Sequence, residues 1–334
     1  MGKLLLDYGS GGKASYRLIK DIFLKYLGNI YLNKLDDAVC LEQIKSPVVM
    51  STDSYTVDPI IFPGGDIGSL AVHGTVNDVA MLGARPKYLS CGFILEEGLD
   101  LALLEQIVCS MAKAAARAKV LVVTGDTKVV PKGAVDKIFI NTTGLGELML
   151  QAPLSGASAK PGDVIILSGT IGDHGLTILS RQKGISFDTK IKSDSAPLNV
   201  LIEKLLNQVP EVHVLRDPTR GGLATTLNEI ARQSQVCCLI EEKLLPIKEE
   251  VRGGCAFLGL DPLYLANEGK FVLILPEQYE RQALDILKQD ELGKDACVIG
   301  KIQSAPIGKV VLQTTLGGQR LLDMLEGEQL PRIC

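Results

Sequence analysis

Four aspartates stand where predicted strands or loops end, and carboxylates at such positions could converge on a hard cation. They are Asp37 in KLDDAVC, Asp53 in MSTDS, Asp78 in TVNDVAM and Asp126 in VTGDTK. Mg²⁺ prefers oxygen ligands and usually shares them with substrate phosphates. A single aspartate also commonly caps a helix or makes a turn, so each position alone indicates little. Together, with Asn77 and Gly125 directly before the last two, they predict a site for a metal-bound nucleotide.

A glycine-rich segment, GSGGK (9–13), could bind the phosphates of such a nucleotide. It places Gly11, Gly12 and Lys13 before helix-like sequence. Glycine lets backbone N–H groups approach a phosphate, and the start of a helix adds a favourable dipole. The segment does not fit the GxxxxGK(S/T) pattern, and Ala14 occupies the last glycine position of GxGxxG. From its own residues it is either a phosphate-binding loop or an ordinary flexible turn.

Loops in the second half of the chain carry residues that could act on a phosphate or on a proton. Arg216 and Arg220, around DPTRGG (217–222), could hold a phosphate because the guanidinium offers a planar fork of donors. Glu268 in NEGK lies beside a glycine before a predicted strand, where a base could be held rigidly. A solvated loop acid would look the same. His174 in IGDHG is interpreted as a loop histidine without a role.

The eight cysteines include no CxxC pair, and the three histidines are too scattered to complete a zinc pattern. Most of the thiols lie in apolar segments and are interpreted as small buried side chains in a reducing compartment. Cys334 differs because it ends the chain, in the segment GEQLPRIC (327–334), whose glycine and proline break regular structure. Such a tail reaches roughly 26 Å when extended, although many chain ends are simply frayed.

The composition argues against two kinds of partner. The formal net charge of −4 lacks the basic excess that a nucleic-acid binder needs, and aromatic residues at 4% provide few stacking platforms. The apolar run before Asp7 is too short for a signal peptide, and no run approaches the roughly 20 residues of a membrane span. We therefore expect a cytoplasmic protein with neither nucleic acid nor membrane as a partner.

Alternating strand-like and helix-like segments would position these residues. In the first half, strands are predicted at 47–52, 87–95, 119–124 and 137–149, and helices at 66–83 and 100–118. After a polar stretch at 151–163, strands are predicted at 164–168, 236–240, 270–275 and near 296–313, and helices after Gly175 and at 197–208, 222–234 and 277–289. A chain of 334 residues is too long for one ordinary core, so the sequence predicts an α/β and α+β protein of two domains.

Seven segments, spread over essentially the whole chain, closely resemble the HypE family of hydrogenase maturation factors. They are GSGGK (9–13), STDSYTVDPIIFPGGDIG (51–68), VNDVAMLGARPKYLS (76–90), GDTKVV (125–130), DPTRGGLA (217–224), NEGK (267–270) and PRIC (331–334). The acidic clusters alone resemble the wider superfamily of aminoimidazole ribonucleotide synthetase, selenophosphate synthetase and thiamine-monophosphate kinase. The terminal PRIC together with the long TDSYTVDP run is specific to HypE.

The resemblance implies an aminoimidazole ribonucleotide synthetase-like fold. Residues 1–152 would form an N-terminal ATP-binding and dimerisation domain, residues 153–326 a C-terminal α+β domain, and residues 327–334 a mobile tail that carries Cys334. The N-terminal sheet would pair with its twin in a homodimer, and ATP would bind in clefts between the N-terminal and C-terminal domains.

The resemblance also implies an activity. In this family the carbamoyltransferase HypF places a carbamoyl group on the terminal cysteine, and HypE uses ATP to dehydrate this thiocarbamate to a thiocyanate. The cyano group then passes to iron on the HypC–HypD scaffold and becomes a cyanide ligand of NiFe hydrogenase.

Carried over residue by residue, the resemblance implies three groups of site residues. Cys334 matches the acceptor thiol, and Pro331 and Arg332 complete the tail motif. Lys128 and Glu268 match positions near the reacting group and are assigned to substrate polarisation and proton removal. Mg²⁺ is assigned to Asp37, Asp53, Asp78 and Asp126, and ATP to these four with Gly11, Gly12, Lys13, Asn77, Gly125 and Arg220.

Three other functions stay open. A kinase or synthetase of the same superfamily, acting on a free small molecule, would not need Cys334. A non-catalytic docking protein would leave the acidic loops without a role. A thiol redox protein would lack its CxxC pair.

Overall fold

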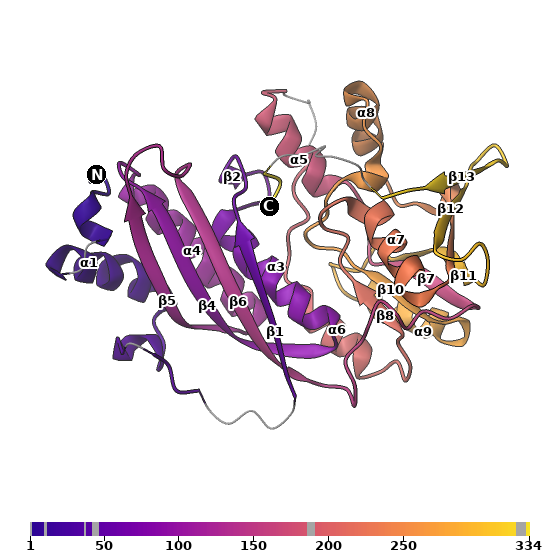
Figure 1. The fold of residues 1–334 in the computed structure, drawn as a ribbon, viewed down its shortest axis with the longest axis horizontal. Coiled ribbons are helices and arrows are strands. Elements are labelled where there is room, and N and C mark those ends of the chain that lie inside the picture. The colour runs from indigo at the N-terminus through magenta and orange to yellow at the C-terminus, as the bar shows by residue number, and fades with distance from the viewer. Residues whose placement is uncertain (1, 10–11, 37, 42–46, 186–190, 325–331) are drawn as a thin grey trace.

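The computed structural model describes residues 2–9, 12–36, 38–41, 47–185, 191–324 and 332–334. Three of the predicted site and tail residues, Gly11, Asp37 and Pro331, lie outside these ranges. The described residues form two main sheets with helices packed on them, and α3 (Ile67–Met81) lies between the two sheets (Figure 1).

The first sheet has four long strands in the order β1 (Val48–Tyr55), β6 (Ile138–Leu148), β4 (Ala84–Glu96) and β5 (Leu121–Val130). β6 is antiparallel to both of its neighbours, whereas β4 and β5 are parallel. The parallel pair requires a crossover connection, which α4 (Leu101–Ala118) supplies. β1 and β5 are therefore the two edges of this sheet.

Helices α3 and α4 cover one face of the first sheet, while Figure 1 shows its other face without a helix among the described residues. Leu70 of α3 and Ile107 of α4 are fully buried in the core that they share with the sheet. On the uncovered face, alternate residues such as Val48, Met50 and Ile94 are exposed. Apolar side chains exposed along one face of a sheet are a typical surface for association.

A helical segment near the N-terminus lies against this domain at the β5 edge. It consists of α1 (Gly12–Leu18), a π-helical turn (Ile19–Phe23) and α2 (Leu24–Leu27). Tyr26 donates a hydrogen bond to Glu105 of α4 at 2.7 Å, and Phe23 packs on Phe93 of β4. The sequence predicted helix-like character only after residue 13, without its extent.

The second sheet has seven strands in the order β13 (Gln319–Leu322), β12 (Lys309–Gln313), β9 (Cys237–Glu241), β11 (Cys297–Gln303), β7 (Asp163–Leu167), β10 (Val272–Pro276) and β8 (Val214–Arg216). β12 and β9 are parallel, and the other pairs are antiparallel. Ile165 and Leu167 pack with α7 (Gly222–Ser234), whereas Val164 and Ile166 pack with α6 (Asn199–Leu206) and α9 (Glu280–Lys288). Because both faces are covered, β7 is apolar and buried from Val164 to Leu167.

The predicted helices and strands are confirmed, with shifts at their ends. β1 continues through Tyr55 and β5 through Val130, so Asp53 and Asp126 lie within strands and not at strand ends. Asp78 likewise lies within α3. The sequence missed α8 (Glu249–Leu258) because its two central glycines weaken the helical pattern.

The buried side-chain amide of Asn77, in α3, connects the first domain to the second. Asn77 Oδ1 accepts a hydrogen bond from the Leu198 amide at 2.8 Å, and its Nδ2 donates to the Ala196 carbonyl at 3.0 Å. These bonds fix the segment before α6 against the first domain. In the part of the chain that the structure describes, no helix combines the length and apolarity that a bilayer crossing requires.

Candidate active site

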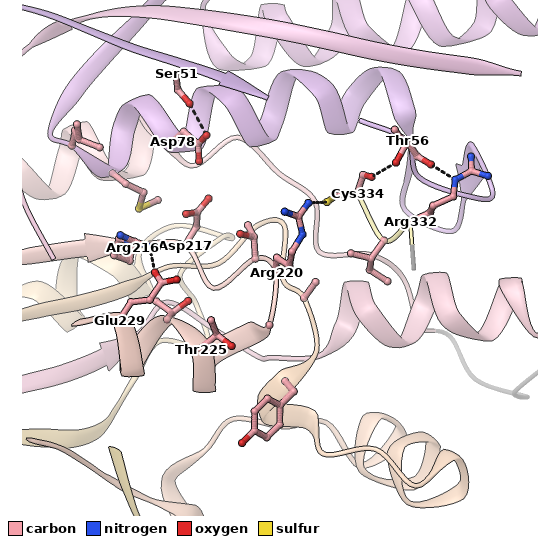
Figure 2. Close-up of a pocket in the computed structure, with 18 of the residues that line it drawn as sticks. Ser51, Thr56, Asp78, Arg216, Asp217, Arg220, Thr225, Glu229, Arg332 and Cys334 are labelled. Carbon is pink, nitrogen blue, oxygen red and sulfur yellow. Dashed lines mark hydrogen bonds and ion pairs between the residues drawn. The ribbon is translucent and has the colours of Figure 1, made fainter. Parts of the chain in front are cut away.

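A cavity of about 920 Å³ lies between the two domains, and the end of the chain forms part of its wall. One side is formed by β1 and α3, and the other by the loop that follows β8 (Figure 2). Arg332, Ile333 and Cys334 line it together with Arg220. The last three residues of the chain therefore lie in the interdomain cleft.

The backbone oxygen of each of these last three residues has a hydrogen-bond partner. The Arg332 carbonyl accepts a hydrogen bond from the Asp58 amide at 3.2 Å, and the Ile333 carbonyl lies 2.8 Å from Nε2 of His174. The Cys334 carbonyl accepts from the backbone N–H and from Oγ1 of Thr56, at 3.0 and 3.3 Å. The terminal segment is thus fixed by contacts that do not involve the sulfur.

Two side chains of the terminal segment anchor it further. The Arg332 guanidinium donates to the Thr56 carbonyl at 2.7 Å and to Asp136 at 2.6 Å, and it lies over the Phe139 ring. The Ile333 side chain is 5% exposed and packs in the core of the first domain. Arginine is suited to such a combined contact because its plane both pairs with a carboxylate and stacks on an aromatic ring.

The Cys334 thiol points into the cavity and is half-buried. Arg220 Nη2 lies 3.6 Å from its sulfur, and Figure 2 shows the guanidinium directed at the sulfur atom. Burial raises the pKa of Cys334 to about 11, and the negative charge of Glu268 adds to this effect. Arg220 opposes the shift without cancelling it. The docked sulfur is therefore a neutral thiol at physiological pH.

Glu268 is buried and close enough for its charge to raise the pKa of this thiol, so the alternative of a solvated loop acid is wrong. Its side chain is 4% exposed, and its backbone N–H donates to Asp194 at 3.2 Å. Its carbonyl accepts from Asn77 Nδ2 at 3.4 Å. Burial raises the pKa of Glu268 well above its ordinary value, and the charge of Asp217 raises it further. A carboxyl with a raised pKa beside a reactive group is typical of a general base.

A group of carboxyls lies along the same cavity. Asp78 accepts a hydrogen bond from Ser51 Oγ at 2.7 Å, and Asp217 follows β8 on the opposite wall (Figure 2). Burial raises the pKa of Asp217 to about 7, and repulsion from Asp78 adds to it. Burial likewise raises the pKa of Asp78, which Asp53 also raises. The DPTRGG sequence indicated a loop that could hold a phosphate, but it gave no separate role to Asp217.

Of the predicted metal residues, the structure describes Asp53, Asp78 and Asp126, and these three are not assembled into one group in this chain. Among the described residues, no three His, Cys, Asp or Glu side chains are close enough to hold a metal ion. Asp78 lines the interdomain cavity and Asp53 is close enough to raise its pKa, whereas Asp126 lines another cavity. The assignment of Mg²⁺ to these residues stays a prediction.

That second cavity, of about 400 Å³, lies where the N-terminal helices meet β5. Its wall is largely apolar, from residues such as Leu18 and Phe23, while Asp126 and Lys128 contribute polar groups. Lys128 pairs with Asp126 at 3.0 Å, and this pair lowers the pKa of Asp126. A largely apolar pocket with a few polar groups is the usual form of a small-molecule site.

The two cavities lie near opposite edges of the first sheet, as the pairing of its strands shows. Asp53 on β1 lies opposite Thr142, Thr142 lies opposite Cys91, and Cys91 lies opposite Gly125, next to Asp126. Three strand spacings of about 4.8 Å place the two aspartates roughly 14 Å apart. The charge of Asp53 acts on both Glu268 and Cys334. Lys128, in contrast, lies on β5 at the opposite edge of the first sheet.

The remaining predicted residues take different positions. Gly12 and Lys13 begin α1, and Lys13 is exposed. Arg216 is paired with Glu229, which leaves Arg220 as the arginine that faces the thiol (Figure 2). The interpretation of His174 was wrong: it is buried in the first turn of α5 (Asp173–Gln182) and contacts the chain end. Nothing in its local sequence indicates this contact.

Comparison with known proteins agrees with this architecture. The AIR synthase related protein family matches the chain twice, with its N-terminal domain over residues 35–148 and its C-terminal domain over residues 160–313. The fold is therefore the two-domain α/β fold of AIR synthase related proteins.

Three relatives narrow the class further. Carbamoyl dehydratase HypE of Azotobacter vinelandii is 52% identical over 100% of this chain and 98% of its own. A crystal structure of hydrogenase maturation protein HypE in complex with ATP has a TM-score of 0.96 at 62% identity and covers 99% of this chain and 100% of its own. A HypE–HypF complex has a TM-score of 0.81 at 49% identity, with 92% and 99% covered. The chain belongs to the HypE family.

Proposed function

We propose that this protein is an ATP-dependent carbamoyl dehydratase that converts an S-carbamoyl group on its own Cys334 into a thiocyanate. The observation that carries the proposal is the position of the terminal sulfur, in the interdomain cavity beside Arg220 and a buried Glu268. The named activity of the relatives and the ATP complex of one of them support it.

The chemistry needs a leaving group and a base. The oxygen of the thiocarbamate attacks the γ-phosphorus of ATP, the bond to the bridging oxygen breaks, and ADP leaves. Glu268 then takes a proton from the nitrogen. When the second N–H proton is lost to solvent, the C–O bond breaks, phosphate departs and the C≡N bond forms. The oxygen of the eliminated water ends in the phosphate and its two protons go to Glu268 and to solvent, so no oxidant or reductant is needed.

Positive groups near the sulfur fit this reaction. Arg220 lies where the phosphoryl group would be added and can balance its charge. Lys128 is assigned to polarisation of the substrate. Mg²⁺ commonly binds through one or two carboxylates plus substrate phosphates, so three preassembled ligands are not required. The mutual repulsion of Asp53, Asp78 and Asp217 fits a bound cation, which Asp53 and Asp78 would hold.

A homodimer would bring the two cavities together. Closing a sheet with a second copy removes exposed edges, and β1 and β5 are the two edges of the first sheet. Such pairing would place Asp126 and Lys128 of one protomer beside Asp53 of the other. It would also cover the exposed face that carries Val48 and Met50. We infer that each active site is shared between two protomers.

The same proposal names the partners. HypF would load the carbamoyl group onto Cys334, and the HypC–HypD complex would receive the cyano group for its iron. The HypE–HypF complex of a relative supports the first of these. The product would be a cyanide ligand of NiFe hydrogenase, made in the cytoplasm.

Mass spectrometry of the tail tests the proposal. After incubation with HypF, carbamoyl phosphate and ATP, Cys334 is expected to gain a carbamoyl group and then to lose the mass of one water. Cys334→Ser, which keeps the size of the side chain, is expected to show neither change. ATP turnover on a free small molecule without any change in the tail mass would instead support a kinase or synthetase.

The rate of thiocyanate formation is expected to fall as the pH decreases. Glu268 acts only when ionised, and burial raises its pKa above the ordinary 4.5, so the base becomes protonated at a higher pH than a free glutamate would. The measurement is a single turnover of chain carbamoylated beforehand at one pH. A rate that stays constant between about pH 5 and pH 8 would exclude Glu268 as the base.

A further inference from the structure

We propose that His174 is a positioning residue that holds the terminal segment in the cavity through the carbonyl of Ile333. This inference rests on the proposed function for its catalytic consequence, although the contact itself does not. His174 is fully buried in the first turn of α5, and its Nε2 lies 2.8 Å from the Ile333 carbonyl oxygen. A carbonyl oxygen can only accept, so Nε2 must carry a proton and donate it.

The other ring nitrogen fixes this tautomer. Nδ1 lies 2.8 Å from Ser193 Oγ, and the same oxygen accepts a hydrogen bond from the Ser195 amide at 3.1 Å. The serine hydroxyl can therefore donate its proton to an unprotonated Nδ1. Burial lowers the pKa of His174, which keeps the ring neutral. The edge-to-face contact with Phe62 sets the ring plane.

The bond acts on the sulfur through the backbone. The carbonyl of Ile333 belongs to the planar peptide unit that ends at the Cα atom of Cys334. A hydrogen bond to that oxygen therefore restrains the position of this Cα atom, from which the cysteine side chain extends. Thr56 holds the next carbonyl from the opposite domain. His174 and Thr56 together hold the final residue between α5 and the segment after β1.

The hydrogen bond does not depend on the group attached to the sulfur. Because His174 binds a backbone oxygen, a chain end with a free thiol, a thiocarbamate or a thiocyanate would be held in the same way. Loss of the donor would leave the Ile333 carbonyl buried without this partner, and such a loss lowers the equilibrium constant for docking by about ten- to a hundredfold. Arg332 and Thr56 would keep the remaining contacts, so the segment would leave the cavity more often.

Two amide substitutions test the role. In His174→Gln the side-chain amide can reach the Ile333 carbonyl, whereas in His174→Asn the same group is one methylene too short. His73→Asn is a matched control, because His73 is also buried and bonded to a serine of the same loop, Ser195, at 2.9 Å. His73 has no part in the proposed site.

The readout is the alkylation of Cys334 by iodoacetamide in the full chain without nucleotide. Cleavage after Glu328 releases the peptide Gln329–Cys334, whose mass reports this thiol alone. We expect a rate about tenfold or more above wild type for His174→Asn, and a rate near wild type for His174→Gln and His73→Asn. Equal rates in the two His174 variants would overturn the proposal.

A second measurement leaves His174 unchanged in case the Asn variant does not fold. The chain has three histidines, so a spectrum with nitrogen-labelled histidine contains only three rings. Removal of Ile333 and Cys334 is expected to make the Nε2 proton of His174 exchange rapidly with water. An unchanged signal would refute the contact.

Catalysis is measured separately. Dehydration of the carbamoylated chain is expected to slow in His174→Asn because the docked fraction falls, and His174→Gln is expected to restore it. If the wild-type chain forms no thiocyanate, the proposed function fails while the alkylation result still decides the role of His174. If the dehydration rates of His174→Asn and wild type are equal, the positioning role fails.

Discussion

Replacement of Glu268 by glutamine is expected to stop thiocyanate formation while ATP still binds and Cys334 still accepts the carbamoyl group. Glutamine keeps the shape of the buried side chain but cannot take a proton, and a general base contributes roughly 10²–10⁴-fold to a rate. The carbamoylated chain should therefore accumulate. Mass spectrometry of the tail in a single turnover measures both species.

Stability measurements separate this loss from unfolding. A carboxyl whose pKa is raised in the folded state is penalised when ionised, so Glu268 destabilises the fold at neutral pH. This penalty shrinks as the pH falls through the raised pKa and is gone below the ordinary value of 4.5. Glu268→Gln should thus unfold at a higher temperature than wild type at pH 8. Glu291→Gln, at an exposed position, is the control for both measurements. Unchanged thiocyanate formation in Glu268→Gln would remove the assignment.

Two inactive variants are expected to restore activity when they are combined in one dimer. Lys128→Met and Glu268→Gln would each inactivate both sites of their own homodimer. In a mixed dimer, one site would receive the intact Lys128 from one protomer and the intact Glu268 from the other. Because half of randomly assembled dimers are mixed and have one intact site, about a quarter of wild-type activity should return.

The control for this experiment combines Cys334→Ser with Glu268→Gln. Glu268 acts on Cys334 within one protomer, so every site in the mixed dimer lacks one of them. Recovery of activity in this control would mean that Cys334 of one protomer reacts with Glu268 of the other, which contradicts the proposed arrangement. No recovery in the Lys128 and Glu268 mixture would show that the site is not shared.

The sequence predicted the regular elements well where burial follows a simple pattern. β4 alternates between buried and accessible residues along much of its length, and β7 is apolar after Asp163 because helices cover both faces of its sheet. α8 and the short β8 were missed because they are held by packing against other elements and not by their own composition.

The site was predicted in part, from motif and resemblance. Cys334, Glu268 and Arg220 do lie together, although they are distant in the chain. Asp217 and His174 were missed as participants because their surroundings are created only by folding. The expectation that Asp53 and Asp126 converge is not met within one chain, since the width of the sheet separates them.

The raised pKa of the docked Cys334 has a consequence for when this residue can react. With a pKa of about 11, only roughly one molecule in several thousand would carry a thiolate at pH 7.5. A thiol in that state is slow towards oxidants and towards acyl donors alike. In the resting chain the acceptor thiol would thus be unreactive while it is docked. It would become reactive only when the terminal segment moves into solvent or into the site of a partner.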